Sequence, residues 1–143
     1  MSEQKAYTVF RTNVVRQGDR IDRIENLIGV GFPDTNGCFS GSEFWMEIKA
    51  PQEPKRGSTP LFGSNHKLSV AQRNWFLRQR RAGGRGFIYI ETDRRRLLLA
   101  GKHADAINEL TVAELIFLCL WNSSRPTTKS HWSDLREILV SHV

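Results

Sequence analysis

The chain has 143 residues, of which 39% are hydrophobic and 25% charged, so it is long enough for one compact domain and too apolar for a disordered one. No apolar run approaches the ~20 residues that span a bilayer, and the first residues, MSEQKAY, lack the apolar stretch of a signal peptide. The net charge is +6, and the two cysteines, Cys38 and Cys119, have no metal-ligand spacing, so we expect a cytoplasmic protein without zinc.

Helices and strands are expected to alternate along the chain. In chain order, we expect a helix over 2–16, a strand around 21–28, two strands within 33–50, a loop over 51–68, a helix over 69–82, strands over 86–92 and 96–101, a helix over 115–121, a loop over 122–130 and a last helix around 132–139. Strand, helix and strand within about fifty residues are typical of a βαβ unit with a parallel strand pair. We see no internal repeat and expect a single domain over 1–143.

The strand that ends at Lys49 carries the most informative residues. Residues 44–49 alternate as a strand does, so Glu47 and Lys49 share one face, and Asp34 lies upstream within reach of a hairpin. Two carboxylates about 4 Å apart repel by roughly 4 kcal/mol at an effective dielectric of 20. A fold tolerates this repulsion if a cation such as Mg²⁺ or Mn²⁺ lies between them. The alternative is an ordinary hairpin with a turn aspartate and a solvated Glu47/Lys49 face.

The sequence PD at 33–34, followed by ExK at 47–49, resembles the motif of the PD-(D/E)XK nucleases. The expected order of helix, three strands, helix and strand also matches the common core of that superfamily. SVAQxxW at 69–75, followed by AGG at 82–84 and an aliphatic strand, resembles the virus-type replication-repair nucleases and their Holliday-junction-resolvase relatives. The resemblance covers about residues 21–100. It implies an α/β, restriction-endonuclease-like core with a mixed central sheet flanked by helices, followed by C-terminal helices.

The resemblance also implies a metal-dependent DNA endonuclease with named site residues. Asp34 and Glu47 would hold Mg²⁺, or Mn²⁺ in its place, together with the backbone carbonyl of Ile48. Lys49 would orient the attacking water and stabilise the developing charge. In the family a glutamine at the position of Gln72 lies near the active site, and the same residue also fits a capping box at the helix start.

A third metal-binding carboxylate is expected but not fixed by the sequence. The resolvases carry a further glutamate on the opening helix, where the only glutamate of this chain is Glu3. Glu25 lies nearer the PD motif and is the candidate we favour, with a surface salt bridge to Arg23 as the alternative. The number of metal ions, one or two, is therefore left open.

The positive charge is concentrated in one part of the chain. Residues 55–96 contain eleven lysines and arginines against two acidic residues, a net charge of +9, which leaves −3 for the rest. This excess predicts a face that binds a polyanion. No base-reading motif is visible, so we expect contacts to phosphates without sequence readout. The residues expected to make them are Lys55, Arg56, Lys67, Arg73, Arg94, Arg95 and Arg96.

These features predict a structure-selective endonuclease that acts on branched or junction DNA. A four-way junction has two symmetry-related scissile strands, so we expect a homodimer. The loop over 51–68 follows Lys49 directly, and its prolines, glycines and serines predict a mobile segment over the site, without a core of its own. The alternatives are a non-catalytic DNA-binding module of the same fold, or a nuclease acting on flaps, nicked duplex or RNA. The small size and the family are compatible with a phage or viral origin, in which case the host cytoplasm is the compartment.

Overall fold

A mixed sheet of six strands forms the centre of the computed structural model, which describes residues 1–24, 31–63 and 65–141. The strands are β1 (Arg20–Arg23), β2 (Thr35–Phe39), β3 (Ser42–Lys49), β4 (Gly86–Glu91), β5 (Arg95–Ala100) and β6 (Trp121–Ser124). They lie side by side in the order of the sequence. All neighbours are antiparallel except β3 and β4, whose parallel pairing confirms the predicted βαβ unit.

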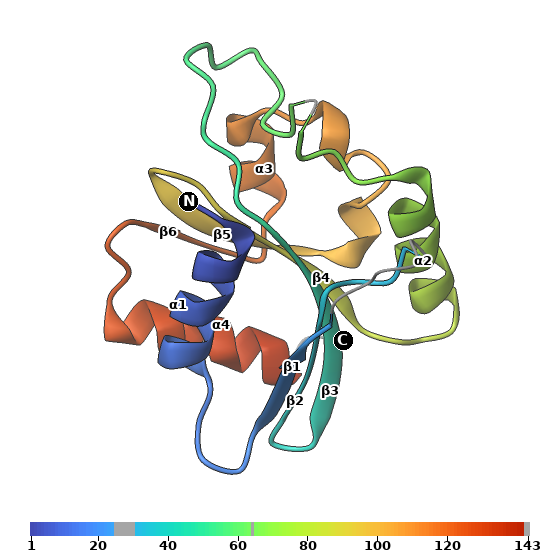
Figure 1. Ribbon diagram of the computed structural model, residues 1–143, viewed down its shortest axis with the longest axis vertical. Helices are drawn as coiled ribbons and strands as arrows, with labels where there is room; N and C mark the ends of the chain where they lie inside the picture. Colours follow the sequence, from blue (N-terminus) through green and yellow to red (C-terminus); the bar gives the residue numbers. More distant parts are fainter. Residues whose placement is uncertain (25–30, 64, 142–143) are drawn as a thin grey trace.

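Helices cover both faces of this sheet (Figure 1). They are α1 (Glu3–Val14), α2 (Val70–Arg81), α3 (Val112–Leu118) and α4 (Lys129–Ser141), with short 3₁₀ helices η1 (Gly101–His103) and η2 (Ile107–Glu109). One core cluster joins α1 and α4 to the sheet, and a second joins α2, α3 and η2 to the opposite face. None of the described helices has the length and apolar character needed to span a lipid bilayer.

Helix α1 begins as the sequence predicts, with the Ser2 hydroxyl accepting from the amide of Lys5 at 3.1 Å. Its buried residues, spaced as one stripe of a helix, are Ala6, Tyr7, Phe10 and Val14. The exposed Thr8 side chain bonds to a carbonyl one turn earlier, which lets a β-branched residue sit in the helix. The ring of Phe10 meets Tyr89 of β4 edge-on, with the centroids 5.3 Å apart, so α1 is held directly against the middle of the sheet.

A two-residue turn joins β2 to β3. Ser40 and Gly41 have φ values of 51° and 81°, the left-handed conformation that a type I′ hairpin requires at both positions. The turn fixes a register in which Thr35 lies opposite Met46. Gly37 adds to this constraint, because a Cβ there would lie 2.5 Å from the ring of Phe44. Asp34, the residue before Thr35, therefore lies beside Glu47, the residue after Met46.

The structure differs from the sequence prediction after residue 110. The predicted helix over 115–121 lies at Val112–Leu118 instead, because its capping box at Thr111 fixes an earlier start. The predicted loop over 122–130 contains the edge strand β6. The indole of Trp121, at the start of β6, packs against Trp132 of α4 with ring centroids 5.9 Å apart.

Two further predictions concern residues 21–28 and 51–68. The first strand is β1, which ends at Arg23, and residues 25–28 lie outside the described part of the chain. The described residues of 51–68 contain no helix or strand, as predicted, and Figure 1 shows the segment extending beyond β3. However, Leu61 and Phe62 are buried in the second core cluster. These two side chains anchor the middle of the segment in the core that it shares with the sheet and α2, although its described residues form no helix or strand of their own.

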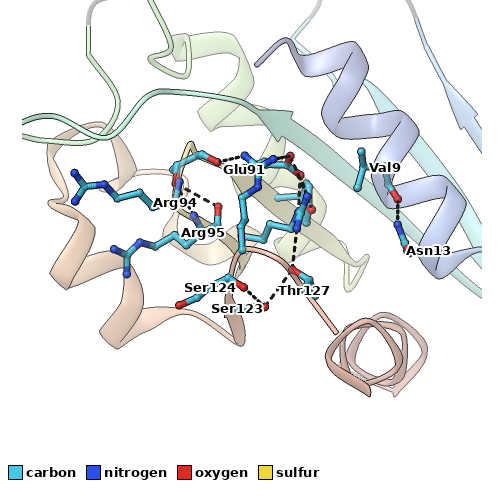
Figure 2. Close-up of polar contacts among 12 residues, drawn as sticks. Val9, Asn13, Glu91, Arg94, Arg95, Ser123, Ser124 and Thr127 are labelled. Carbon is cyan, nitrogen blue, oxygen red and sulfur yellow. Dashed lines mark hydrogen bonds and ion pairs between the residues drawn. The ribbon is translucent and has the colours of Figure 1, made fainter. Parts of the chain in front are cut away.

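A buried ionic network ties β4 and β5 to the segment before α4. Glu91 is fully buried and accepts hydrogen bonds from Arg96 Nε at 2.9 Å and the Tyr89 hydroxyl at 3.2 Å. Arg96 also donates to the Thr127 hydroxyl at 2.9 Å, and its guanidinium lies 5.1 Å from the Trp132 ring centre. Figure 2 shows Glu91 and Thr127 within this network. The Arg96 cation therefore compensates a charge that water does not reach.

We expect Arg96→Ala to destabilise the protein by about 3–5 kcal/mol, because it leaves Glu91 buried without its main partner. Denaturant unfolding of the variant measures this loss of free energy. Arg94→Ala is the matched control, since Arg94 is mostly exposed and should change stability by less than about 0.5 kcal/mol. Equal unfolding curves for the two variants would show that the network contributes nothing to stability.

Candidate metal centre

Three carboxylates from three elements converge at one end of β3. Asp34 precedes β2, Glu47 lies on β3 and Glu3 lies in the first turn of α1, with one oxygen of each within 4.8 Å of the others. The hairpin register places Asp34 next to Glu47, and the Asp34 amide donates to Glu47 Oε1 at 3.2 Å. Among the described residues, the third carboxylate in this group is Glu3. The favoured candidate, Glu25, lies outside the described residues.

Neighbouring donors hold the Asp34 side chain in one orientation. The buried Thr35 hydroxyl donates to Asp34 Oδ1 at 3.0 Å, and the amide of Ile48 donates to the same oxygen at 3.2 Å. A guanidinium nitrogen of Arg23 lies 4.0 Å from the other oxygen, and Arg23 also donates to the side chain of Gln4 on α1. Sequence reasoning missed the contributions of Thr35 and Arg23. Thr35 follows the PD motif directly, which was the available signal for its role.

Lys49 and Gln72 both contact the same oxygen of Glu47. Lys49 Nζ lies 3.6 Å from Glu47 Oε2, and Gln72 Nε2 donates to that oxygen at 3.2 Å. The other end of the Gln72 amide accepts from the backbone of Ser69, which completes the capping box of α2. Gln72 therefore lies beside Glu47 and also caps the start of α2, the two arrangements that the sequence suggested. Gly31 brings its segment close to α2, because a Cβ there would lie 2.6 Å from the backbone of Ala71.

Burial changes the protonation of the central carboxyls. It raises the pKa of Asp34 to about 6, although the Thr35 hydroxyl and Arg23 oppose the shift. Burial, and then repulsion by Asp34, raise the pKa of Glu47 to about 8 against the opposing charge of Lys49. The nearest cationic nitrogens are too distant for the short hydrogen bonds that Glu91 receives. Closely spaced carboxylate oxygens without nitrogen or sulfur ligands fit a hard cation such as Mg²⁺ or Mn²⁺.

The basic residues predicted to contact DNA are not equivalent. Lys55, Arg56 and Lys67 are exposed on the 51–68 segment. Arg95 is paired with Glu53 at 2.8 Å, and the Arg96 side chain is only 7% exposed, whereas that of Arg94 is 70% exposed. Figure 2 shows Arg94 extending away from the buried network. Of the three arginines predicted to contact DNA in this turn, Arg94 is the one whose side chain is mostly exposed. Arg73 on α2 is half-buried, and its Nε has no hydrogen-bond partner among the described residues.

The fold matches that of a known nuclease. No protein-family model and no curated protein matches the sequence. The structure is similar to that of Archaeoglobus fulgidus Hjc, a Holliday junction resolvase from an archaeal hyperthermophile, with 12% identity, a TM-score of 0.52 and coverage of 80% of this chain and 88% of that chain. The structure of SSO0001 has 15% identity and a TM-score of 0.35, over 96% of this chain and 56% of that chain, which is too low to indicate a shared fold. The mixed six-stranded sheet with flanking helices shares the fold of Hjc, which confirms the predicted α/β fold class.

The metal-free protein should lose stability as the pH rises from about 4 to about 8. In this range the folded chain holds protons on Asp34 and Glu47, whose pKa values of about 6 and 8 lie above the ordinary 3.8 and 4.5 of an unfolded chain. The folded state thus binds more protons, and the free energy of unfolding falls by up to about 1.4 kcal/mol per pH unit for each excess proton. Urea unfolding in a chelator at several pH values measures the slope.

The doubly substituted variant Asp34→Asn, Glu47→Gln is the control for this pH dependence. It keeps the size of both side chains and removes both titrations, so the difference in slope between it and the wild type isolates the two carboxyls. Mg²⁺ should stabilise the wild type more at about pH 8 than at pH 6, since fewer protons compete with it. Identical slopes for the two proteins would contradict the shifts.

Proposed function

We propose that this chain is a metal-dependent, structure-selective DNA endonuclease that hydrolyses phosphodiester bonds. The observation that carries the proposal is the meeting of Glu3, Asp34 and Glu47 with Lys49 and Gln72 at one site. Carboxylates this close and this buried repel one another unless a cation or protons compensate them. The likeness of the fold to that of Hjc supports a nuclease as the class of enzyme.

Each of these residues has a role in the proposed chemistry. Asp34, Glu47 and the carbonyl of Ile48 would hold Mg²⁺, or Mn²⁺ in its place, with Glu3 as a further carboxylate. When bound, such an ion neutralises charge on a phosphate and lowers the pKa of a bound water. The ammonium of Lys49, beside Glu47 Oε2, can donate to that water or to a phosphate oxygen and stabilise the charge that develops.

The supporting residues keep these groups in place. The Thr35 hydroxyl and the Ile48 amide fix one oxygen of Asp34, which leaves its second oxygen directed toward Arg23. Gln72 fixes Glu47 from the first turn of α2. Preorganised ligands of this kind need little rearrangement when substrate binds.

The proposed substrate is branched DNA, above all the four-way junction. The structural neighbour is a resolvase of such junctions, and the basic excess of this chain suits a polyanion. We propose that the exposed side chains of Lys55, Arg56, Lys67 and Arg94 contact phosphates, and that the half-buried Arg73 of α2 does so as well. A two-fold dimer would present two sites to the two symmetry-related scissile strands.

A panel of labelled substrates tests this proposal. It contains a four-way junction, a flap, a nicked duplex, a linear duplex and a single-stranded RNA, each incubated with Mg²⁺ and, separately, with a chelator. We expect Mg²⁺-dependent cleavage with a preference for the junction. Cleavage of another member would name another nuclease substrate, and binding without cleavage would indicate a non-catalytic DNA-binding module of this fold.

Alanine at Asp34, Glu47 or Lys49 should each abolish cleavage while sparing DNA binding. Loss of a metal ligand or of the ammonium removes several kcal/mol of charge stabilisation, on the order of a 10³-fold loss in rate. Single-turnover cleavage and an electrophoretic binding assay measure the two properties separately. Glu43→Ala is the matched control, because Glu43 is an exposed carboxylate on the same strand. Near wild-type turnover in any of the three site variants would refute the assignment of the site.

A further inference from the structure

A concave site separate from the candidate metal centre lies at the C-terminal end of α2, whereas Gln72 lies in the first turn of this helix. It is a cavity of about 260 Å³ between α2, the start of β4 and the passage from β5 into η1. Its apolar wall includes Phe76 and Phe87, both buried. Gly101 allows the close packing there, because a Cβ at this position would lie 2.6 Å from the ring of Phe76. The cavity is thus bounded by tightly packed elements.

Three cationic residues line this cavity from three different segments. They are Arg80 in the last turn of α2, Arg85 just before β4, and Lys102 in η1. Arg85 is also hydrogen-bonded to a backbone carbonyl of β3, whereas Arg80 and Lys102 are exposed. None of the described residues that line the cavity is acidic. The pKa of the adjacent His103 is lowered by burial and by the positive charges of Lys102 and Arg80, which agrees with a local positive potential.

We infer that this cavity binds a backbone phosphate of the DNA, away from the phosphate that is cleaved. The inference rests on the proposed function, because it assigns a second contact to the same substrate. The cations at the rim of the cavity suit a phosphate, the sequence-independent contact that positions a protein on DNA. None of the three cationic residues belongs to the set that the sequence analysis assigned to DNA.

The geometry of α2 places this contact relative to the scissile phosphate. Gln72, which bonds to Glu47, and Arg80 lie on the same helix. A helix rises about 1.5 Å per residue, so the positions of Gln72 and Arg80 are about 12 Å apart along the helix axis. This separation exceeds the ~3.4 Å by which successive phosphates of one DNA strand advance along the duplex. The phosphate in the cavity is therefore a different one from the cleaved phosphate.

The test compares charge-removing variants on two sides of α2. Arg80→Gln combined with Lys102→Gln removes the two exposed cations of the cavity. Arg78→Gln is the matched control: it removes one arginine from the same turn, but Arg78 is exposed on another side of the helix and does not line the cavity. Junction binding is measured without Mg²⁺ over a series of salt concentrations, and thermal unfolding checks that each variant is folded.

We expect the double variant to lower the slope of log K against log[salt] by about 0.9, because one phosphate contact is lost. The Arg78→Gln variant should keep the wild-type slope, and Arg80→Lys with Lys102→Arg should keep it as well because the charges remain. A wild-type slope in the folded double variant would overturn the inference.

A second measurement needs no protein variant. Single phosphates of the substrate are replaced, one at a time, by uncharged methylphosphonates, and the affinity of the wild-type protein is measured for each. We expect a loss of affinity at a phosphate away from the cleavage position, and no loss at any such phosphate would overturn the inference. If no substitution away from the cleavage position weakens binding while the wild type still binds and cleaves DNA, the cavity contact is refuted and the proposed function stands. If the wild type neither binds nor cleaves any DNA, the proposed function fails and this inference fails with it.

Discussion

The two-residue turn at Ser40 and Gly41 determines how β2 meets β3, and the candidate metal centre depends on that register. Side chains of a strand alternate between faces, so a slip of one residue would move Asp34 to the face opposite Glu47. The lack of a side chain at Gly37, against the ring of Phe44, reinforces the same register. A turn well removed from the carboxylates thus decides whether they meet at all.

Two groups of buried acidic residues in this protein are compensated in different ways. Glu91 receives a short hydrogen bond from a buried guanidinium and a second from a tyrosine, so its charge is matched within the fold. Asp34 and Glu47 face each other, with the nearest cationic nitrogens at 4.0 and 3.6 Å respectively. A mismatch of this kind lowers stability and persists where function requires it. The contrast separates an ionic network that serves the fold from a cluster suited to binding a cation.

The local patterns of the sequence were sufficient for most of the architecture. The alternation of residues 44–49 and the capping box at Ser69 each act over a few residues, and each predicted its element. Strand β6 was missed because, after Trp121, its residues Asn122, Ser123 and Ser124 have little β propensity and form a strand by pairing with β5. Its place at the edge follows from tertiary contacts.

The site was predicted in part for the same reason. Asp34, Glu47, Lys49 and Gln72 lie in motifs, whereas the position of Glu3 follows from the packing of α1 through contacts such as that of Phe10 with Tyr89. The burial of the Arg96 side chain could have been predicted from the sequence. A turn at residues 93–94 pairs Arg96 with Glu91, and that pairing predicts an ion pair instead of a phosphate contact.

The position of Glu3 also couples two events that are distant in the sequence. Glu3 is attached to the sheet only through α1, so it meets Asp34 and Glu47 when that helix is docked. For any cation that all three carboxylates hold, docking of α1 and occupancy of the centre are linked equilibria with one shared coupling free energy. Whatever affinity the ion gains from Glu3 is also the amount by which the ion tightens α1 on the sheet. The protection of α1 from hydrogen exchange would therefore report whether the candidate metal centre holds an ion.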